Sequence, residues 1–275
     1  MAAKHNIIGI VSDEFANPSS VKMLNEVTRQ LNARGCLSLL LNVNSREHYL
    51  SLLSKATELG VNGLIFLTSL YREEASSFPA IWLSGENALR ADNYDAGAEI
   101  GRLLLAQGHQ RFGVMHGEDP ATEPRQMQGF VASLAAADKT LDQRLIAGNN
   151  DRELAYQAMM AYLKKTRAAE RINALFCEND VLAFGVMQAV RDFGQGVHIG
   201  VVGFDDVDEA RSPTWHLTSW AQRGDLLVAE ALNRLLDNKA DDSAAWQQGE
   251  LQVRHSHHGK HVHGEMSKCG CASRH

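Results

Sequence analysis

The chain has 275 residues, of which 44% are hydrophobic and 22% are charged, and this composition is typical of a globular protein with room for two sizeable cores. The formal net charge is −6, so the chain lacks the basic surplus that neutralises phosphates, and we expect it to bind DNA poorly by itself. The apolar run before Asp13 is too short for a secretory signal or a membrane span, which favours a cytoplasmic protein without membrane contacts.

Regular alternation of apolar runs and helical periodicities marks the first part of the chain. Strands are expected at 7–11, 36–43, 64–67 and 80–83. The intervening helices carry apolar residues three and four positions apart; one ends at Gly35, and another begins after Ser45, which can cap it. Repeated strand and helix at this spacing predicts a doubly wound parallel sheet with helices on both faces.

The pattern restarts after residue 91. The sequence Asp92-Asn93-Tyr94-Asp95-Ala96-Gly97 opens a helix that ends at Gly108. Later helices are expected near residue 130, at about 151–165 and at 179–193, and strands at 111–116, 145–147, 174–177 and 199–204. Two successive series of alternating strands and helices, similar in size, predict an α/β protein with two similar doubly wound parallel-sheet lobes.

Two of these strands end abruptly in polar residues. Strand 174–177 stops at Glu178, Asn179 and Asp180, and strand 199–204 stops at Asp205 and Asp206. The helix between the strands makes them parallel, so both clusters lie at carboxyl ends, where open α/β sheets bind ligands. Each acid alone is as readily explained as a helix cap or turn former, but two clusters on neighbouring strands favour a site.

These motifs carry a family resemblance. Asn179-Asp180 with Leu182-Ala183-Phe184-Gly185, followed by Val201-Val202-Gly203-Phe204-Asp205-Asp206, resembles the effector-binding domain of the lac repressor (LacI/GalR) family of bacterial transcription regulators. The segment 92–97 with Gly108-His109, and the ending Arg254-His255-Ser256, extend the resemblance over most of the chain.

The resemblance implies the type 1 periplasmic-binding-protein fold, in which several crossovers join the lobes. The first lobe is expected at 5–91 plus about 221–240, and the second at 92–220 plus about 245–256. It also implies that the strand at 217–222 and the helix after it return to the first lobe. A small effector is then expected in the cleft between the lobes.

The resemblance also implies a set of ligand-binding side chains. They are polar and suited to hydroxyl groups, because a carboxylate accepts from two hydroxyls and an Asn both donates and accepts. The candidates are Asn17, Ser19, Asp92, Arg125, Gln126, Asn150, Asn179, Asp205 and Gln222.

Departures from the family pattern restrict the effector. Ser19 and Ser20 replace the aromatic residues of sugar-binding relatives, Ser84 stands where an Asp is common, and Gln126 occupies an Arg position. The set is neutral to mildly acidic, and a buried phosphate without a positive partner is costly. We therefore expect a neutral polyol or sugar-like effector, and weaker binding of simple pentoses than relatives show.

The expected function is the effector-sensing core of a LacI-type regulator or repressor, which is not an enzyme and needs no cofactor. Such regulators carry an N-terminal helix-turn-helix, whereas this chain starts close to its first strand, so operator DNA is expected to be bound only through a domain absent from it. A homodimer is expected by family analogy. A solute-binding protein of the same fold is the alternative, and the lack of a signal peptide counts against it.

A hydrolase is a further alternative. Four carboxylates that follow strands could hold Mg²⁺, provided that both strands belong to one sheet: Asp13, Glu14, Asp205 and Asp206. The sequence contains no nucleophile elbow, P-loop or dinucleotide fingerprint, which argues against enzymatic activity.

The C-terminal residues 257–275 are rich in His and Cys. His257, His261, Cys269 and Cys271 are ligand types for Zn²⁺, Ni²⁺ or Cu, but their spacing matches no defined zinc module. A disordered extension is favoured over a metal site. The remaining cysteines, Cys36 and Cys177, lie in apolar runs where a free thiol behaves as a small hydrophobe, so a disulfide framework is not indicated.

Overall fold

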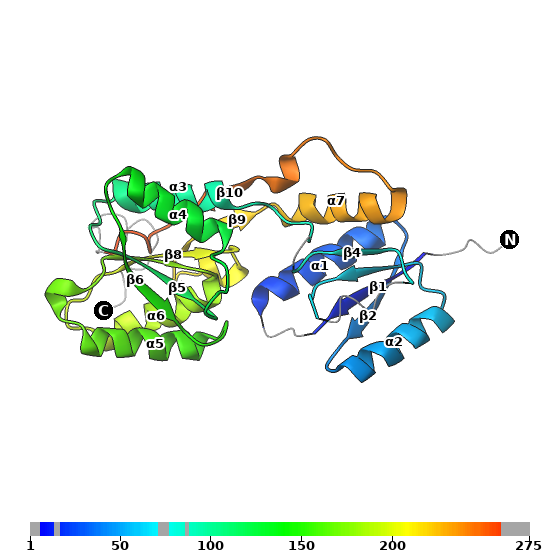
Figure 1. The fold of residues 1–275 in the computed structure, drawn as a ribbon, viewed down its shortest axis with the longest axis horizontal. Helices are drawn as coiled ribbons and strands as arrows, with labels where there is room; N and C mark the ends of the chain where they lie inside the picture. The colour runs from blue at the N-terminus through cyan, green and yellow to red at the C-terminus, as the bar shows by residue number, and fades with distance from the viewer. Residues whose placement is uncertain (1–5, 14–16, 71–76, 86–87, 260–275) are drawn as a thin grey trace. The chain divides into compact units, whose positions relative to one another are not determined.

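The structure is a computed structural model that describes residues 6–13, 17–70, 77–85 and 88–259. The chain forms two compact units (Figure 1). Unit 1 comprises Met1–Ala91 and Arg223–Gln248, and unit 2 comprises Asp92–Gln222 and Gly249–His275. Within the described ranges, no helix has the length and apolarity that crossing a membrane requires.

Unit 1 is built on a parallel sheet with the strand order β2-β1-β3-β4. Its strands are β1 (Ile7–Ser12), β2 (Leu37–Asn42), β3 (Gly63–Phe66) and β4 (Ala80–Trp82). Helices α1 (Pro18–Ala33) and α7 (Gly224–Asp237) pack on one face of this sheet, and α2 (Arg46–Glu58) packs on the other (Figure 1). The expected alternation of strand and helix is confirmed here.

Local sequence signals explain where the helices of unit 1 begin. The Asn17 side chain accepts a hydrogen bond from the Ser19 amide, and Pro18 occupies the first turn of α1, where its missing N–H has no cost. Ser45 caps α2 by accepting from the His48 amide. The chain enters β2 through Cys36, whose side chain is buried between α1 and the sheet.

Unit 2 contains a six-stranded sheet with the order β10-β9-β8-β7-β5-β6, parallel except for β10. Its strands are β5 (Phe112–His116), β6 (Leu141–Ile146), β7 (Ala174–Cys177), β8 (Gly200–Phe204), β9 (Thr218–Gln222) and β10 (Gly249–Gln252). Helices α3 (Tyr94–Ala106) and α4 (Arg125–Ala136) cover one face, and α5 (Arg152–Lys165) and α6 (Asp180–Phe193) cover the other (Figure 1).

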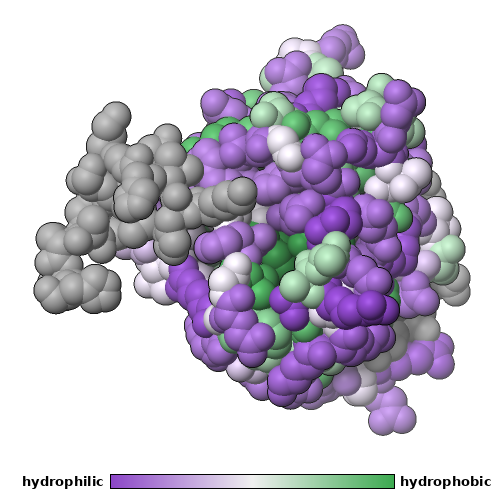
Figure 2. All heavy atoms as spheres, turned by 90° about the vertical axis from the view of Figure 1, so that its left-hand side faces the viewer, coloured by the Kyte–Doolittle hydropathy of each residue, from purple (hydrophilic) through white to green (hydrophobic). Residues whose placement is uncertain are grey.

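Apolar strands buried on both faces explain the near-continuous hydrophobic runs of the central strands. Phe112, Phe176 and Phe204 face α3 and α4, whereas Met115 and Cys177 face α5 and α6. At the end of unit 2 shown in Figure 2, hydrophilic side chains cover most of the surface and apolar side chains gather near its centre.

Helices α3 and α4 approach each other through glycines. A Cβ atom at Gly97 would lie 1.6 Å from the Gln126 carbonyl oxygen, and one at Gly129 would lie 1.9 Å from the Tyr94 carbonyl oxygen. Only glycine allows this approach of two helix backbones. The contact fixes the start of α4, which carries two of the expected site residues.

Strand β9 corrects one expectation. The resemblance implied that this strand and the helix after it both return to the first lobe, but β9 pairs with β8 and with β10 inside unit 2. Of these two elements, only the helix α7 belongs to unit 1. The reason is hydrogen bonding, because β9 has a partner strand on each side in the sheet of unit 2.

Strand β6 begins earlier than expected, at Leu141 rather than at Leu145. It is an edge strand, so Asp142 and Arg144 lie exposed, and the apolar run that marks a buried strand covers only its last residues.

The C-terminal segment also differs from expectation. His257 is only 2% exposed, so it belongs to the folded part of unit 2 and not to a disordered tail. Its Nδ1 lies 2.8 Å from Thr218 Oγ1, and its carbonyl oxygen accepts a hydrogen bond from His109 Nε2 at 2.8 Å. The other candidate metal ligands, His261, Cys269 and Cys271, lie outside the described residues.

Candidate functional site

Polar side chains line the carboxyl edge of the sheet in unit 2. Gln222 ends β9, Asp205 follows β8, and Asn179 follows β7, and these three strands are consecutive neighbours. Neighbouring strands lie about 4.8 Å apart, so the three side chains emerge side by side. The expected clustering of Asn179 and Asp205 on adjacent strand ends is therefore a feature of the fold.

Asp205 and Gln222 are directly bonded. Gln222 Nε2 donates to Asp205 Oδ1 at 3.0 Å, and Asn93 Nδ2 donates to Gln222 Oε1 at 3.4 Å. Asp205 is half-buried, and its backbone has φ 99°, a left-handed conformation that residues other than glycine adopt only under constraint. Its backbone amide donates to the Trp220 carbonyl at 2.9 Å, which ties the turn to β9.

Asn179 and Asn150 form a second bonded pair. Asn179 caps α6, since its Oδ1 accepts from the Leu182 amide at 3.1 Å, and its Nδ2 donates to Asn150 Oδ1 at 2.7 Å. The same Asn150 oxygen lies close against Gly117, where a Cβ atom would be 2.2 Å away. Asn179 thus serves as a cap and also positions a polar neighbour.

A charged cluster that sequence reasoning missed lies at the end of β5. The His116 ring is fully buried; its Nδ1 is 3.3 Å from Glu178 Oε2, and Arg144 Nη1 is 2.7 Å from its Nε2. His116 Nε2 also lies 3.3 Å from Glu123 Oε1, and the same Glu123 carboxylate is paired with Arg144 at 2.6 Å. His116 thus contacts Glu178, the first residue of the polar stretch after β7.

Asp180 was likewise not among the candidates, although it adjoins Asn179. Its carboxylate is 1% exposed and accepts from Ser219 Oγ at 2.7 Å and from the Val207 amide at 2.8 Å. Burial and the nearby Asp205 and Asp206 raise the pKa of this carboxyl, the two hydrogen bonds oppose the shift, and the resulting pKa is about 7. The available sequence signal was the position of Asp180 in the first turn of α6, together with Gly203 in strand β8, where a Cβ atom would lie against the Asp180 carboxylate.

Asp92, Arg125 and Gln126 lie at the starts of α3 and α4. The Arg125 guanidinium contacts both Asp92 oxygens, with Nε 2.7 Å from Oδ1, and it also stacks on the Tyr94 ring. Both charged side chains are more than half exposed. The only cation among the candidates is therefore already paired, and Gln126 contacts Gly97 through its backbone.

Asn17 and Ser19 belong to unit 1, where they form the start of α1. Asp13 directly follows β1 of the same unit, and Glu14 lies outside the described residues. The hydrolase alternative required the strands before these acids and before Asp205 to share one sheet. They do not, because β1 and β8 belong to separate sheets. In the described ranges no three His, Cys, Asp or Glu side chains are grouped so that they could hold a metal ion.

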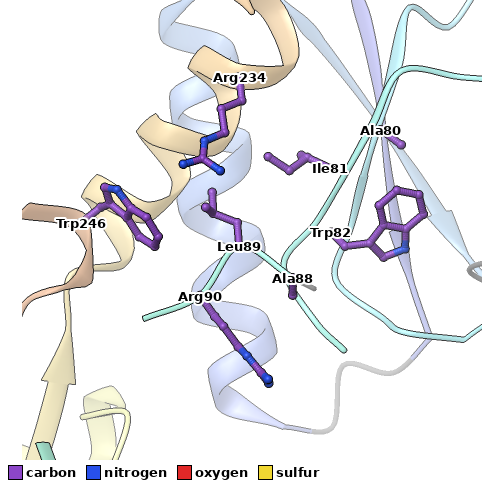
Figure 3. Close-up of a pocket in the computed structure, with 8 residues that line it drawn as sticks. All are labelled: Ala80, Ile81, Trp82, Ala88, Leu89, Arg90, Arg234 and Trp246. Atoms are coloured by element: carbon purple, nitrogen blue, oxygen red, sulfur yellow. The ribbon is translucent and has the colours of Figure 1, made fainter. Parts of the chain in front are cut away.

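Unit 1 also contains a pocket of about 360 Å³, between β4, α7 and the short helix at Ala245–Gln247 (Figure 3). Its lining combines apolar side chains with Arg90 and Arg234, and it includes Trp246, which the Arg234 guanidinium overlies. Arg234 is paired with Glu230 at 2.7 Å. None of the expected site residues lines this pocket, and its two charged side chains are arginines, which donate hydrogen bonds but do not accept them.

The chemistry of the polar edge is recognition by hydrogen bonding. It presents amides and carboxylates, and the thiol nearest to it, Cys177, is fully buried, which raises its pKa well above the usual range. The amide N–H groups of Gln222 and Asn179 donate to oxygens of Asp205 and Asn150, which holds these side chains in place, and they can exchange these partners for hydroxyl groups of a bound molecule.

Comparison with known proteins identifies the family of the chain. Residues 4–222 match the family model described as periplasmic binding proteins and the sugar binding domain of the LacI family. The HTH-type transcriptional repressor PurR of Escherichia fergusonii is 28% identical over 249 residues, which cover 84% of this chain and 72% of that repressor.

Two solved structures illustrate the shared fold. One is a LacI family transcriptional regulator from Enterococcus faecium with bound ribose, with TM-score 0.74 and 23% identity over 91% of this chain and 98% of that one. The other is the lac repressor dimer bound to operator and the anti-inducer ONPF, with TM-score 0.74 and 19% identity over 93% and 95%. The chain therefore belongs to the family of periplasmic binding proteins and LacI sugar-binding domains, as a LacI/GalR effector-binding domain with the type 1 periplasmic-binding-protein fold.

Proposed function

We propose that this domain binds a neutral, sugar-like effector at the carboxyl edge of the unit 2 sheet. The row Gln222, Asp205 and Asn179 on three consecutive strand ends is the observation that carries the proposal. Asn150 extends the row through its bond to Asn179, and Asn17 and Ser19 are proposed as contacts from unit 1. The ribose in the Enterococcus faecium relative supports the carbohydrate class.

The charge of the edge argues for a neutral effector. Asp205 contributes a carboxylate, and Arg125, the candidate cation, is engaged by Asp92. A phosphate dianion placed beside Asp205 would meet its negative charge, and the guanidinium of Arg254 is already paired with Asp206, so burial of the dianion there would be costly. Hydroxyl groups, in contrast, can donate to Asp205 and exchange hydrogen bonds with the amides of Asn179 and Gln222.

In the proposed role, effector binding controls the DNA binding of a helix-turn-helix domain outside these 275 residues. The operator bound by the lac repressor dimer supports this assignment. The net charge of −6 argues against specific duplex binding by the present chain itself. A sequence-selective gel shift at nanomolar concentration and physiological salt would contradict that part of the proposal.

We also propose that the domain forms a homodimer and that the edge of β2 contributes to the interface. β2 is an outer strand of its sheet, and Leu37 and Leu40 on it are 55% and 48% exposed. Exposed apolar side chains on an unpaired edge invite a second chain. Sedimentation is expected to give a dimer at micromolar concentration and a weakened dimer for Leu40→Glu, with the exposed Leu59→Glu as control.

A thermal melt-shift screen tests the effector class, with monosaccharides, disaccharides, sugar phosphates, nucleobases and amino acids as probes. A molecule present at a hundred times its Kd should add about 2.7 kcal/mol to the free energy of unfolding. We expect the strongest shifts from neutral sugars and their loss in Asp205→Ala. A sugar phosphate as the only strong hit would contradict the proposed neutral class, and a hit that Asp205→Ala retains would contradict the proposed site.

A further inference from the structure

The turn between β8 and β9 is held by one buried carboxylate. Asp180, the first residue of α6, accepts from the Val207 amide through Oδ2 and from the Ser219 hydroxyl through Oδ1. Ser219 Oγ in turn accepts from the Asp206 amide at 3.0 Å. The two backbone amides that follow Asp205 are therefore both anchored, directly or through one hydroxyl, to Asp180.

This anchoring supports an unusual backbone. Asp205 has φ 99° and Asp206 has φ 48°, two consecutive left-handed residues without glycine, and such conformations persist only where the surroundings constrain them. The fit is tight, because a Cβ atom at Gly203 would lie 2.1 Å from Asp180 Oδ1. The direction of the Asp205 side chain, and its bond to Gln222, depend on this turn.

We propose that Asp180 is a positioning residue whose ionised carboxylate holds the Asp205 turn in the conformation that receives the effector, so that protonation of Asp180 weakens binding. The inference rests on the proposed effector site at Asp205. Asp180 does not touch the effector in this proposal, because the Asp180 side chain is only 1% exposed.

Protonation would disturb the anchor for a definite reason. As an ion, Asp180 only accepts, whereas the neutral acid must donate one hydrogen bond. A proton on Oδ1 can be donated only towards Ser219 Oγ, and the Ser219 hydroxyl then loses the acceptor that it has now. Hydrogen bonds to a charged acceptor are also about twice as strong as those to a neutral one.

The groups around Asp180 place its protonation near neutral pH. Burial and the carboxylates of Asp205 and Asp206 raise the pKa of Asp180 to about 7, and Asp206 is itself paired with Arg254 at 2.7 Å. The other titratable neighbour is Cys177 on β7, whose pKa burial raises and which therefore stays a neutral thiol.

The change Asp180→Asn tests the proposal, because Asn keeps the size of the side chain and imitates the neutral acid. Its fold should survive. The carboxyl binds its proton more tightly in the folded than in the unfolded chain, so ionising it as the pH rises from about 4 to 7 lowers the stability. Asn carries no such cost, and the variant should melt at pH 8 no lower than the wild type.

The first readout needs no effector. In amide NMR spectra of the 275-residue chain between pH 5.5 and 8.5, the Asp206 and Val207 signals should titrate with one midpoint near 7. Asp180→Asn should abolish this titration. The control Asp208→Asn removes a carboxylate that is 90% exposed and touches neither amide, and it should leave the titration intact. A wild-type turn that does not titrate, or a titration that persists in Asp180→Asn, overturns the proposal.

The second readout uses D-ribose and maltose in melts at pH 6 and pH 8. Because about one tenth of the protein keeps Asp180 ionised one pH unit below its pKa, the apparent affinity should fall up to about tenfold at pH 6. Asp180→Asn has no ionised fraction, so it should bind at pH 8 at least as weakly as the wild type binds at pH 6, with no further change at low pH.

The outcomes separate the two proposals. If Asp205→Ala abolishes the sugar shift while Asp180→Asn and low pH leave it unchanged, the effector site stands and the role of Asp180 is refuted. If neither sugar shifts the wild-type melt at pH 8, the proposed effector class fails, and the amide titration alone decides on Asp180.

Discussion

The Asn179 side chain donates from Nδ2 to Oδ1 of Asn150 at 2.7 Å while its own Oδ1 caps α6. One amide group thus performs a structural task with its oxygen and holds a neighbouring polar group with its nitrogen. The two tasks can be separated by substitution, because an Asp side chain offers the capping oxygen without the donor.

Asn179→Asp is expected to keep the stability of the domain and to lose the effector-induced melt shift. Asp and Asn are comparable N-caps, and a negative charge at a helix N-terminus is favourable. Asn179→Ala, the matched variant, should lose about 1 kcal/mol of stability as well as the shift. An Asn179→Asp protein that retains the full shift would show that the residue is a cap only.

Arg125→Ala should leave the stability close to that of the wild type, because its ion pair with Asp92 is largely exposed. It should also leave the affinity for a neutral effector unchanged, since the guanidinium is bonded to Asp92 and Gln128. Calorimetric titration with the strongest neutral hit checks this expectation. A loss of binding in Arg125→Ala, with Arg152→Ala unaffected, would place Arg125 among the contacts.

Gly97→Ala should destabilise unit 2 by about 3 kcal/mol or more, because the added methyl group overlaps the Gln126 carbonyl and must push α3 away from α4. Gly224→Ala provides the control. A Cβ atom there meets nothing within 4 Å, so Ala should be neutral or stabilise by up to about 1 kcal/mol. Urea denaturation of both variants gives the comparison, and equal midpoints would contradict the close contact.

The folded domain should lose stability on acidification partly through His257. Burial, together with the neighbouring His258, His109 and His255, lowers the pKa of His257 to about 4. The unfolded chain then binds the proton more readily between about 6.5 and 4, so stability is complete above 6.5 and falls as the pH drops through that window.

His257→Asn should flatten this acid dependence, because Asn keeps an acceptor near Thr218 and cannot be protonated. Melts between pH 4.5 and 7.5 measure the difference between the variant and the wild type. The exposed histidine variant His198→Asn should retain the wild-type slope, and identical slopes in all three proteins would contradict the assigned role of His257.

Much of the fold follows from local signals in the sequence. Apolar runs such as Ala174–Cys177 identify strands buried on both faces, and caps such as Ser45 mark helix starts. An apolar run does not mark the whole of an outer strand, because polar residues alternate there, as at Asp142 and Arg144 in β6. The predicted strand is then too short. The sheet that β9 joins depends on pairing between distant segments, which periodicity does not report.

The candidate site, like the fold, could be predicted from the sequence only in part. The motifs around Asn179 and Asp205 indicate which strand ends carry polar groups, and the order of β7, β8 and β9 brings those ends together. The sequence does not indicate that Asp180 reaches Ser219, since that contact needs the turn geometry and a glycine at position 203. Nor does it indicate that Arg125 pairs with Asp92, which depends on how closely α3 and α4 pack.

The buried cysteines offer a way to time the unfolding of each unit separately. Cys36 lies in the core of unit 1 and Cys177 in the core of unit 2, and both are free thiols. A thiol that is shielded in the folded state reacts with an alkylating reagent only after its own unit opens. Pulsed alkylation followed by peptide mass analysis therefore yields two independent opening rates from one unmodified chain, and a difference between them would show that the units do not unfold in a single cooperative step.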